Sequence, residues 1–251
     1  MKKTFIYILF VMLASTLSAA TPEQLMEQGN KAYESKNYQE AINTYQDILH
    51  QGYASHQLYY NLGNAHFRMG DYAHAILFYE RALRINPTDA ETLENLELAQ
   101  SRTQDQIEEI PQFLVVRLYK SMLRWLSPTG WLMATLILAA IALSAIVVLI
   151  ISSNYQTRKW SFVIAAAALL AALLAGANAW ASYSRQQNHD EAIVMPTMIS
   201  VKSSPEEGGI EKFILHSGTK VEITDELNDW YKIVIADGEK GWLHANEIER
   251  I

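Results

Sequence analysis

The chain has 251 residues, of which 50% are hydrophobic, a formal net charge of −7 and no cysteine. This acidic balance argues against a nucleic-acid partner, which requires a basic face, and the lack of cysteine excludes disulfides, thiolate catalysis and most structural zinc sites. The hydrophobic residues concentrate at 4–20, 131–151 and 161–180, which indicates several separate segments rather than one soluble domain.

The first twenty residues have the pattern of an export signal. Lys2 and Lys3 form a short basic region, an apolar run follows from Phe5 to Leu17, and small residues at 18–20 suit a signal peptidase. Because the apolar run is short for a membrane span, we predict a signal peptide over 1–20 that is cleaved at its end. An uncleaved anchor is the alternative, and both interpretations carry the rest of the chain across the membrane.

Residues 21–105 contain an internal repeat with a period of 34 residues. Identical residues recur at this interval in five pairs: Gly29 and Gly63, Tyr38 and Tyr72, Ala41 and Ala75, Ile42 and Ile76, and Tyr45 and Tyr79. The second copy also has a Gly70-Asp71 turn and ends at Pro87. This pattern resembles the tetratricopeptide repeat, a pair of helices in each 34-residue unit. We therefore predict an all-α domain of two repeats over 21–105, closed by a capping helix that starts at Ala90.

In tetratricopeptide repeat domains the first helix of each pair lines a concave peptide-binding groove. By that resemblance six side chains would face the groove: Asn30, Tyr33, Tyr60, Asn64, Phe67 and Arg68. Asn side chains can hold a peptide backbone, and Arg68 can pair with a carboxylate. The alternative is that the aromatic residues form core and Arg68 is only solvated, because an aromatic stripe at helical spacing usually marks packing.

Segment 106–130 is predicted to be an amphipathic linker at a membrane surface. Its apolar and aromatic residues are interleaved with Arg117, Lys120 and Arg124, a pattern typical of helices that lie in the bilayer interface. These three cations would contact phospholipid headgroups. A turn at Ser127 to Gly130 is expected to end the segment.

Two apolar stretches, 131–151 and 161–182, are each long enough to span a hydrocarbon core of about 30 Å. Trp residues stand at their ends, as interface anchors do: Trp131, Trp160 and Trp180. The loop at 152–160 is too short for a domain, so the two helices should form a transmembrane hairpin. A stripe of small residues on the second helix could pack on the first helix or on another protein: Ala168, Ala172 and Gly176.

Basic residues give conflicting indications of the hairpin's orientation. Arg158 and Lys159 favour a cytoplasmic loop, whereas the three cations of the preceding linker favour the opposite orientation of the hairpin. We let the export signal decide, because it fixes the side of the first domain. The sequence then predicts a two-pass protein of a bacterial inner membrane, with both soluble domains on the periplasmic side.

Residues 190–251 change to a period of two, with turn signals such as Asp237-Gly238, which predicts five or so short strands in a small barrel. Four motifs resemble the bacterial SH3-like domain: Val201 to Pro205, Leu215 to Val221, Trp230 to Ile233 and Gly241 to Leu243. Such domains bind peptides or cell-wall fragments. The resemblance implies a ligand surface at Trp230 and Tyr231, whose aromatic faces suit peptides and sugars, whereas Trp242 is expected in the core.

No motif for catalysis, a cofactor or a metal was found, so we predict that the chain is not an enzyme and binds no cofactor. The seven histidines show no metal-ligand spacing: His50, His56, His66, His74, His189, His216 and His244. There is also no Gly-rich phosphate loop and no nucleophile elbow.

The fold class predicted is a multi-domain membrane protein: an all-α tetratricopeptide repeat domain, a two-helix transmembrane hairpin and a small all-β SH3-like barrel. This order of segments resembles the BatE proteins of the Bacteroides aerotolerance (Bat) operon along the whole chain. The resemblance implies a scaffold linked to oxidative-stress tolerance, with partners that are membrane proteins with von Willebrand factor A domains and a MoxR-type ATPase system. The alternative is a protein that binds peptidoglycan or peptides through the SH3-like domain.

Overall fold

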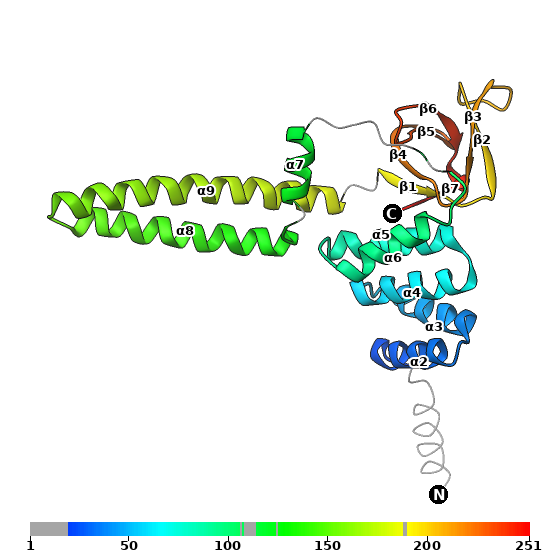
Figure 1. The fold of residues 1–251 in the computed structure, drawn as a ribbon, viewed down its shortest axis with the longest axis horizontal. Helices are drawn as coiled ribbons and strands as arrows, with labels where there is room; N and C mark the ends of the chain where they lie inside the picture. Colours follow the sequence, from blue (N-terminus) through cyan, green and yellow to red (C-terminus); the bar gives the residue numbers. More distant parts are fainter. Residues whose placement is uncertain (1–19, 106, 108–113, 124, 188–189) are drawn as a thin grey trace, which may run out of the picture.

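The computed structural model describes residues 20–105, 107, 114–123, 125–187 and 190–251. Along the chain it has a helical domain, a hairpin of two long helices and a β-domain (Figure 1). The export signal predicted at 1–20 lies outside the described residues except for Ala20. The headgroup contacts predicted for Arg117, Lys120 and Arg124 lie outside the described side chains as well.

The helical domain consists of two helix pairs and one further helix. Their bounds are α2 (Pro22–Glu34), α3 (Tyr38–His50), α4 (His56–Met69), α5 (Tyr72–Ile85) and α6 (Ala90–Gln100). Polar side chains cap most of these helices at their first turn, as N-cap residues commonly do: Thr21, Ser55, Asp71 and Asp89. Gly70 ends α4 in a left-handed conformation with φ of 80°, which glycine adopts without steric cost.

The two helix pairs are each closed by the same contact between a glycine and a tyrosine. A Cβ added to Gly63 would lie 2.5 Å from Tyr79 Cε1, and one added to Gly29 would collide with Tyr45 in the same way. Both tyrosines are 1% exposed. The 34-residue spacing therefore marks positions where the backbone of one helix must approach an aromatic ring of the next.

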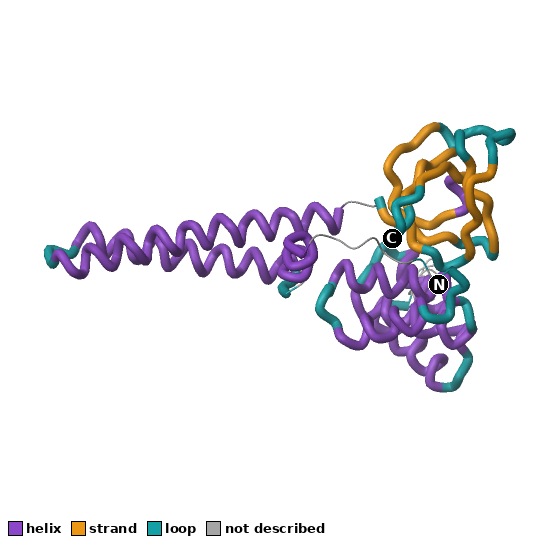
Figure 2. Tube along the Cα trace, turned by 45° about the horizontal axis from the view of Figure 1, so that its top comes forward, coloured by secondary structure: helices purple, strands orange, loops and turns teal. Residues whose placement is uncertain are grey.

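The hairpin is formed by α8 (Pro128–Ile151) and α9 (Tyr155–Gln187), which lie side by side and extend away from the other domains (Figures 1 and 2). The predicted ends of these two helices differ from those in the structure. The predicted turn at Ser127 to Gly130 is the start of α8, because the Ser127 hydroxyl accepts a hydrogen bond from Gly130 N at 3.2 Å. The predicted loop at 152–160 shrinks to residues 152–154, since Asn154 caps α9 through Gln156 N.

Small residues on α9 face α8, which resolves the open question about the predicted stripe. Ala168 and Ala172 are buried, and a Cβ on Gly176 would lie 3.7 Å from Thr135 of α8. Close approach of two helices through small side chains is typical of membrane helix pairs. The short helix α7 (Leu114–Leu123) lies beside the end of the hairpin that faces the rest of the protein (Figures 1 and 2).

The β-domain is one antiparallel sheet of seven strands rather than about five. The strands are β1 (Glu191–Val194), β2 (Met198–Lys202), β3 (Glu211–His216), β4 (Lys220–Leu227), β5 (Trp230–Val234), β6 (Lys240–His244) and β7 (Ile248–Arg250), in the order β3-β2-β6-β5-β4-β1-β7. Fully buried aliphatic side chains fill its core, including Val201, Ile233 and Leu243. The predicted Asp237-Gly238 turn joins β5 to β6, with Gly238 at φ of 87°.

Candidate functional site

The α2, α4 and α6 helices form a common surface, here called the first-helix face. It carries a repeated hydrogen-bond ladder. The Tyr45 hydroxyl and Asn61 Nδ2 both donate to Asn30 Oδ1, at 2.8 and 3.0 Å. One repeat later, the Tyr79 hydroxyl and Asn95 Nδ2 donate to Asn64 Oδ1, at 2.7 and 3.1 Å. Burial raises the pKa of Tyr45 to about 12. The two predicted groove asparagines thus join helices, and their carbonyl oxygens are already used.

The other four predicted groove residues differ in how much of each side chain is available. Tyr60 and Phe67 are half-buried and pack on the core around α5. Tyr33 is also half-buried, and its hydroxyl accepts a hydrogen bond from Nε of the exposed Arg68 at 3.3 Å. This bond raises the Arg68 pKa. Arg68 is therefore the predicted residue best placed to meet an anionic group, because its charge stays at the surface.

The burial of the two tryptophans of the β-domain is the reverse of the expected one. Trp230, predicted on the ligand surface, is 8% exposed, whereas Trp242, expected in the core, is half-buried. Strand alternation explains Trp242, because Leu243 beside it points into the core and is 0% exposed. Tyr231 is half-buried, with the Arg250 guanidinium 4.8 Å from its ring centre.

Trp230 instead belongs to a polar cluster next to the loop that joins β2 to β3. Its ring contacts the His244 ring in a tilted arrangement with centroids 3.8 Å apart, and Lys202 Nζ lies 5.1 Å from the ring centre. Glu207 contacts both side chains, at 3.2 Å to Lys202 Nζ and 2.9 Å to His244 Nε2. Hydrogen bonds from His244 and Lys202 lower the Glu207 pKa. These contacts fix the loop and cover the tryptophan face.

The helical domain and the β-domain are packed against each other. Ile193 of β1 and Ile251 are buried in the same cluster as Ile76 of α5. Ionic contacts surround this apolar patch, and each joins residues far apart in the sequence: Arg81 with Glu249 at 3.0 Å, Lys220 with Glu80 at 3.0 Å, and Arg84 with Glu191 at 3.6 Å. Burial by itself lowers the Lys220 pKa. The nearby carboxylates of Glu80 and Glu191 have the larger effect, so the pKa lies above its ordinary value.

Asp105, just after α6, is held by the β-domain. Its carboxylate accepts hydrogen bonds of 2.7 Å from His216 N, His216 Nδ1 and the Thr219 hydroxyl. Burial raises the Asp105 pKa, but these bonds prevail and hold the pKa below its usual range. The segment that leaves the helical domain is therefore tied to the β-domain before it continues toward the hairpin.

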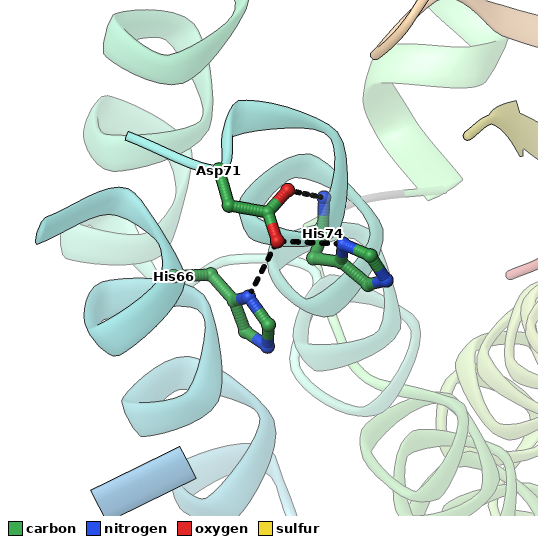
Figure 3. A group of neighbouring side chains, drawn as sticks. All are labelled: His66, Asp71 and His74. Carbon is green, nitrogen blue, oxygen red and sulfur yellow. Dashed lines mark hydrogen bonds and ion pairs between the residues drawn. The ribbon is translucent and has the colours of Figure 1, made fainter. Parts of the chain in front are cut away.

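The structure also gathers three side chains that sequence analysis treated as scattered (Figure 3). His66 at the end of α4, Asp71 at the N-cap of α5 and His74 in the first turn of α5 have possible ligand atoms within 4.8 Å of one another. Asp71 Oδ2 lies 3.0 Å from His66 Nδ1 and 2.7 Å from His74 Nδ1. The helix-turn-helix geometry at Gly70 creates this proximity, which a search for fixed histidine spacings misses.

This cluster perturbs the titration of its members. Burial raises the Asp71 pKa, but the interactions of the carboxylate with His66 and His74 overcome this effect and hold the pKa well below its ordinary value. The Asp71 carboxylate in turn raises the His74 pKa. Of the three, His66 is buried, while the Asp71 and His74 side chains are each 39% exposed. The cluster is thus open to solvent on one side.

Two segments of the chain match known families. Residues 56–89, which include α4 and α5, match the tetratricopeptide repeat. Residues 201–249 match the bacterial SH3 domain. No curated protein sequence matches the chain. The architecture therefore combines a tetratricopeptide repeat and a bacterial SH3 domain, on either side of two helices that are long and apolar enough to cross a membrane.

Proposed function

We propose that this chain is a non-enzymatic adaptor, anchored in a bacterial inner membrane by the α8–α9 hairpin and carrying its two binding domains as one unit on the periplasmic side. The observation that supports it most is the packed contact between the two domains. Tetratricopeptide repeats and bacterial SH3 domains both suggest protein interaction or cell-wall binding.

The surface of the hairpin supports membrane insertion. At 1.5 Å per residue, the 24 residues of α8 and the 33 of α9 extend for about 36 and about 50 Å, enough to cross a hydrocarbon core of about 30 Å. Large apolar side chains on both helices are exposed, including Ile150 at 76% and Leu173 at 65%. Such a surface is costly in water and favourable in lipid.

The contact between the domains supports their position on one side of the membrane. An antiparallel hairpin returns the chain to the side from which it entered, and the Arg81–Glu249 and Lys220–Glu80 pairs require both domains on that side. The choice of the periplasmic side rests on the export signal predicted at 1–20.

We further propose partners by the resemblance to BatE proteins: membrane proteins with von Willebrand factor A domains and a MoxR-type ATPase system, in a complex linked to oxidative-stress tolerance. The exposed cation of Arg68 on the first-helix face suits an anionic partner segment. The half-buried Tyr60 and Phe67 on the same helix would supply apolar contact.

Peptidoglycan binding through the β-domain is the second candidate, and the match of residues 201–249 favours it. The distance from the hairpin argues for the adaptor. Only residues 188–190 separate the last residue of α9 from β1, and such a connection reaches at most about 14 Å. The β-domain is therefore held near the membrane surface, where membrane proteins are more accessible than distant wall material.

A mild-detergent pull-down of the full chain from native membranes tests the proposal, with co-purified proteins identified by mass spectrometry. The Arg68→Glu variant should lose the partner, because charge reversal on the first-helix face repels an anionic segment. Lys36→Glu is the matched control: the same charge change at an exposed turn between α2 and α3 should keep the partner.

Sedimentation of the same detergent-solubilised chain with purified peptidoglycan is the competing arm. Co-purified envelope proteins that disappear only with Arg68→Glu support the adaptor. Co-sedimentation with the wall together with an empty pull-down would replace it by the second candidate.

A further inference from the structure

The His66–Asp71–His74 cluster is not part of the framework of the repeat. The first repeat has Ala32, Asn37 and Glu40 at the three corresponding positions, one period of 34 residues earlier. That copy still forms the same helix pair with the same glycine–tyrosine contact. The two histidines are therefore an addition to one copy, and the fold of a repeat does not require them.

Hydrogen bonding accounts poorly for the arrangement of the cluster. His74 Nδ1 is buried and lies 2.7 Å from Asp71 Oδ2, yet its direction does not meet hydrogen-bond geometry. His66 Nε2 is buried without a partner in the described part of the chain. Buried polar atoms are normally paired, so His74 Nδ1, which lies inside the cluster, points to a missing partner there.

A metal ion supplies that partner. Two imidazole nitrogens at 2.7 and 3.0 Å from one carboxylate oxygen are slightly closer than the donors around a tetrahedral zinc ion, which stand about 3.3 Å apart when bonds are about 2.0 Å long. The three ligand atoms lie within 4.8 Å of one another, so the two histidine nitrogens must also move toward each other before one ion contacts all three. Donors that converge on a common point also explain why the nitrogen of His74 is not aimed along the line to Asp71.

We propose that His66 Nδ1, Asp71 Oδ2 and His74 Nδ1 bind one divalent transition-metal ion. Two imidazoles and one carboxylate suit zinc and its neighbours better than magnesium or calcium, which prefer oxygen ligands alone. Water completes the coordination, because the Asp71 and His74 side chains face solvent on one side. The ion joins the last turn of α4 to the first turn of α5, the helix on which the β-domain packs.

The same contacts set the strength of the site. A ligating histidine usually donates its second nitrogen to a supporting group, and His66 Nε2 has no such group in the described part of the chain. With three protein ligands and no supporting group at His66 Nε2, we expect the ion to be exchangeable rather than a permanent structural one.

Zinc titration of the metal-stripped full chain in detergent, followed by calorimetry, tests the site. We expect one ion per chain. Loss of a supporting group alone changes metal affinity about 10- to 100-fold, so His74→Gln and His66→Gln should each weaken binding by at least about that factor. His50→Gln, at an exposed position of α3, is the matched control and should leave the isotherm unchanged.

A second measurement needs no variant and so does not depend on whether a variant folds. Diethyl pyrocarbonate labels accessible histidines, and zinc should protect His74 but not His50 in the native chain, as read by peptide mass spectrometry. The proposal is overturned if the native chain binds no zinc, if a double His66→Gln, His74→Gln variant binds it equally well, or if His74 is labelled equally with and without zinc.

Discussion

The two tetratricopeptide-type repeats differ in what surrounds them. Both have a glycine that packs against a buried tyrosine, and an asparagine that accepts a hydrogen bond from the tyrosine hydroxyl. Among the described residues, the ion pairs between a repeat and the β-domain come from the second repeat, through Glu80, Arg81 and Arg84 of α5. The first repeat has Gln46, Asp47 and His50 at these three positions.

This comparison separates the residues that close each helix pair from the residues that contact the β-domain or form the His66–Asp71–His74 cluster. The shared set closes each helix pair and appears at the period of 34 residues. The set found in the second copy alone lies on the surface of α5 and in the α4–α5 turn, where it serves the β-domain and the His66–Asp71–His74 cluster. The second repeat is therefore both a structural unit and the junction of the soluble part.

The variants with the largest expected effect test whether contact with the β-domain adds stability to the second repeat. Tyr79→Ala and Tyr45→Ala each remove a buried ring, which costs about 3–5 kcal/mol in a typical core. Tyr79→Ala should cost more, because the cluster around Tyr79 also holds Ile193 and Ile251 of the β-domain. Hydrogen exchange of the full chain, read helix by helix, measures the loss.

The location of the loss distinguishes the outcomes of that experiment. Tyr79→Ala should accelerate exchange in α4, α5 and β1, whereas Tyr45→Ala should affect α2 and α3 but spare the β-domain. Equal costs and no change in β1 would show that the domains are stable independently of their contact.

The next effect is one that the two repeats should share. Gly63→Ala places a methyl group 2.5 Å from Tyr79 Cε1, and Gly29→Ala does the same at Tyr45. Overpacking of this kind costs about 1–3 kcal/mol, since the ring must move within a dense core. The two variants should lower the thermal midpoint of the helical domain by similar amounts. A harmless Gly63→Ala would mean that the ring is less tightly held than its 1% exposure indicates.

Local patterns predicted the elements because each has a strong signal along the sequence. The 34-residue repeat gave the helix pairs, uninterrupted apolar runs gave the two hairpin helices, and alternation with turn residues gave the strands. Element ends were less predictable, since Ser127 and Asn154 resemble loop residues until their side chains are seen to cap α8 and α9.

The candidate sites were only partly predictable because they depend on tertiary contacts. Trp230 and Ile233 are both buried although they lie on opposite faces of β5. Ile233 belongs to the core, whereas His244 and Lys202 cover Trp230 on the other face. The pairing of β4 with β5 also has a register shift, on β4 between Ile223 and Asp225. No local feature of the sequence predicts such a shift. The pair of Lys220 and Glu80 is equally hidden, because 140 residues separate its members.

The smallest expected effect concerns the segment that leaves the second repeat. Asp105→Asn removes the charge that accepts bonds from His216 and Thr219, and should cost about 1–2 kcal/mol at neutral pH. The folded-state pKa of Asp105 lies below the ordinary value of 3.8, so its contribution is complete above that value and is lost as the pH falls through the folded-state pKa.

Thermal unfolding of the native chain and of Asp105→Asn, compared between about pH 7 and about pH 3, measures this contribution. The difference between the two should be largest at neutral pH and shrink in the acid range. Asp47→Asn, on α3 of the first repeat, is the matched control and should show no such trend, because no ion pair or hydrogen bond to its side chain is found among the described residues. A difference that stays constant with pH would mean that Asp105 contributes through shape rather than charge, and that the ionic junction is confined to α5.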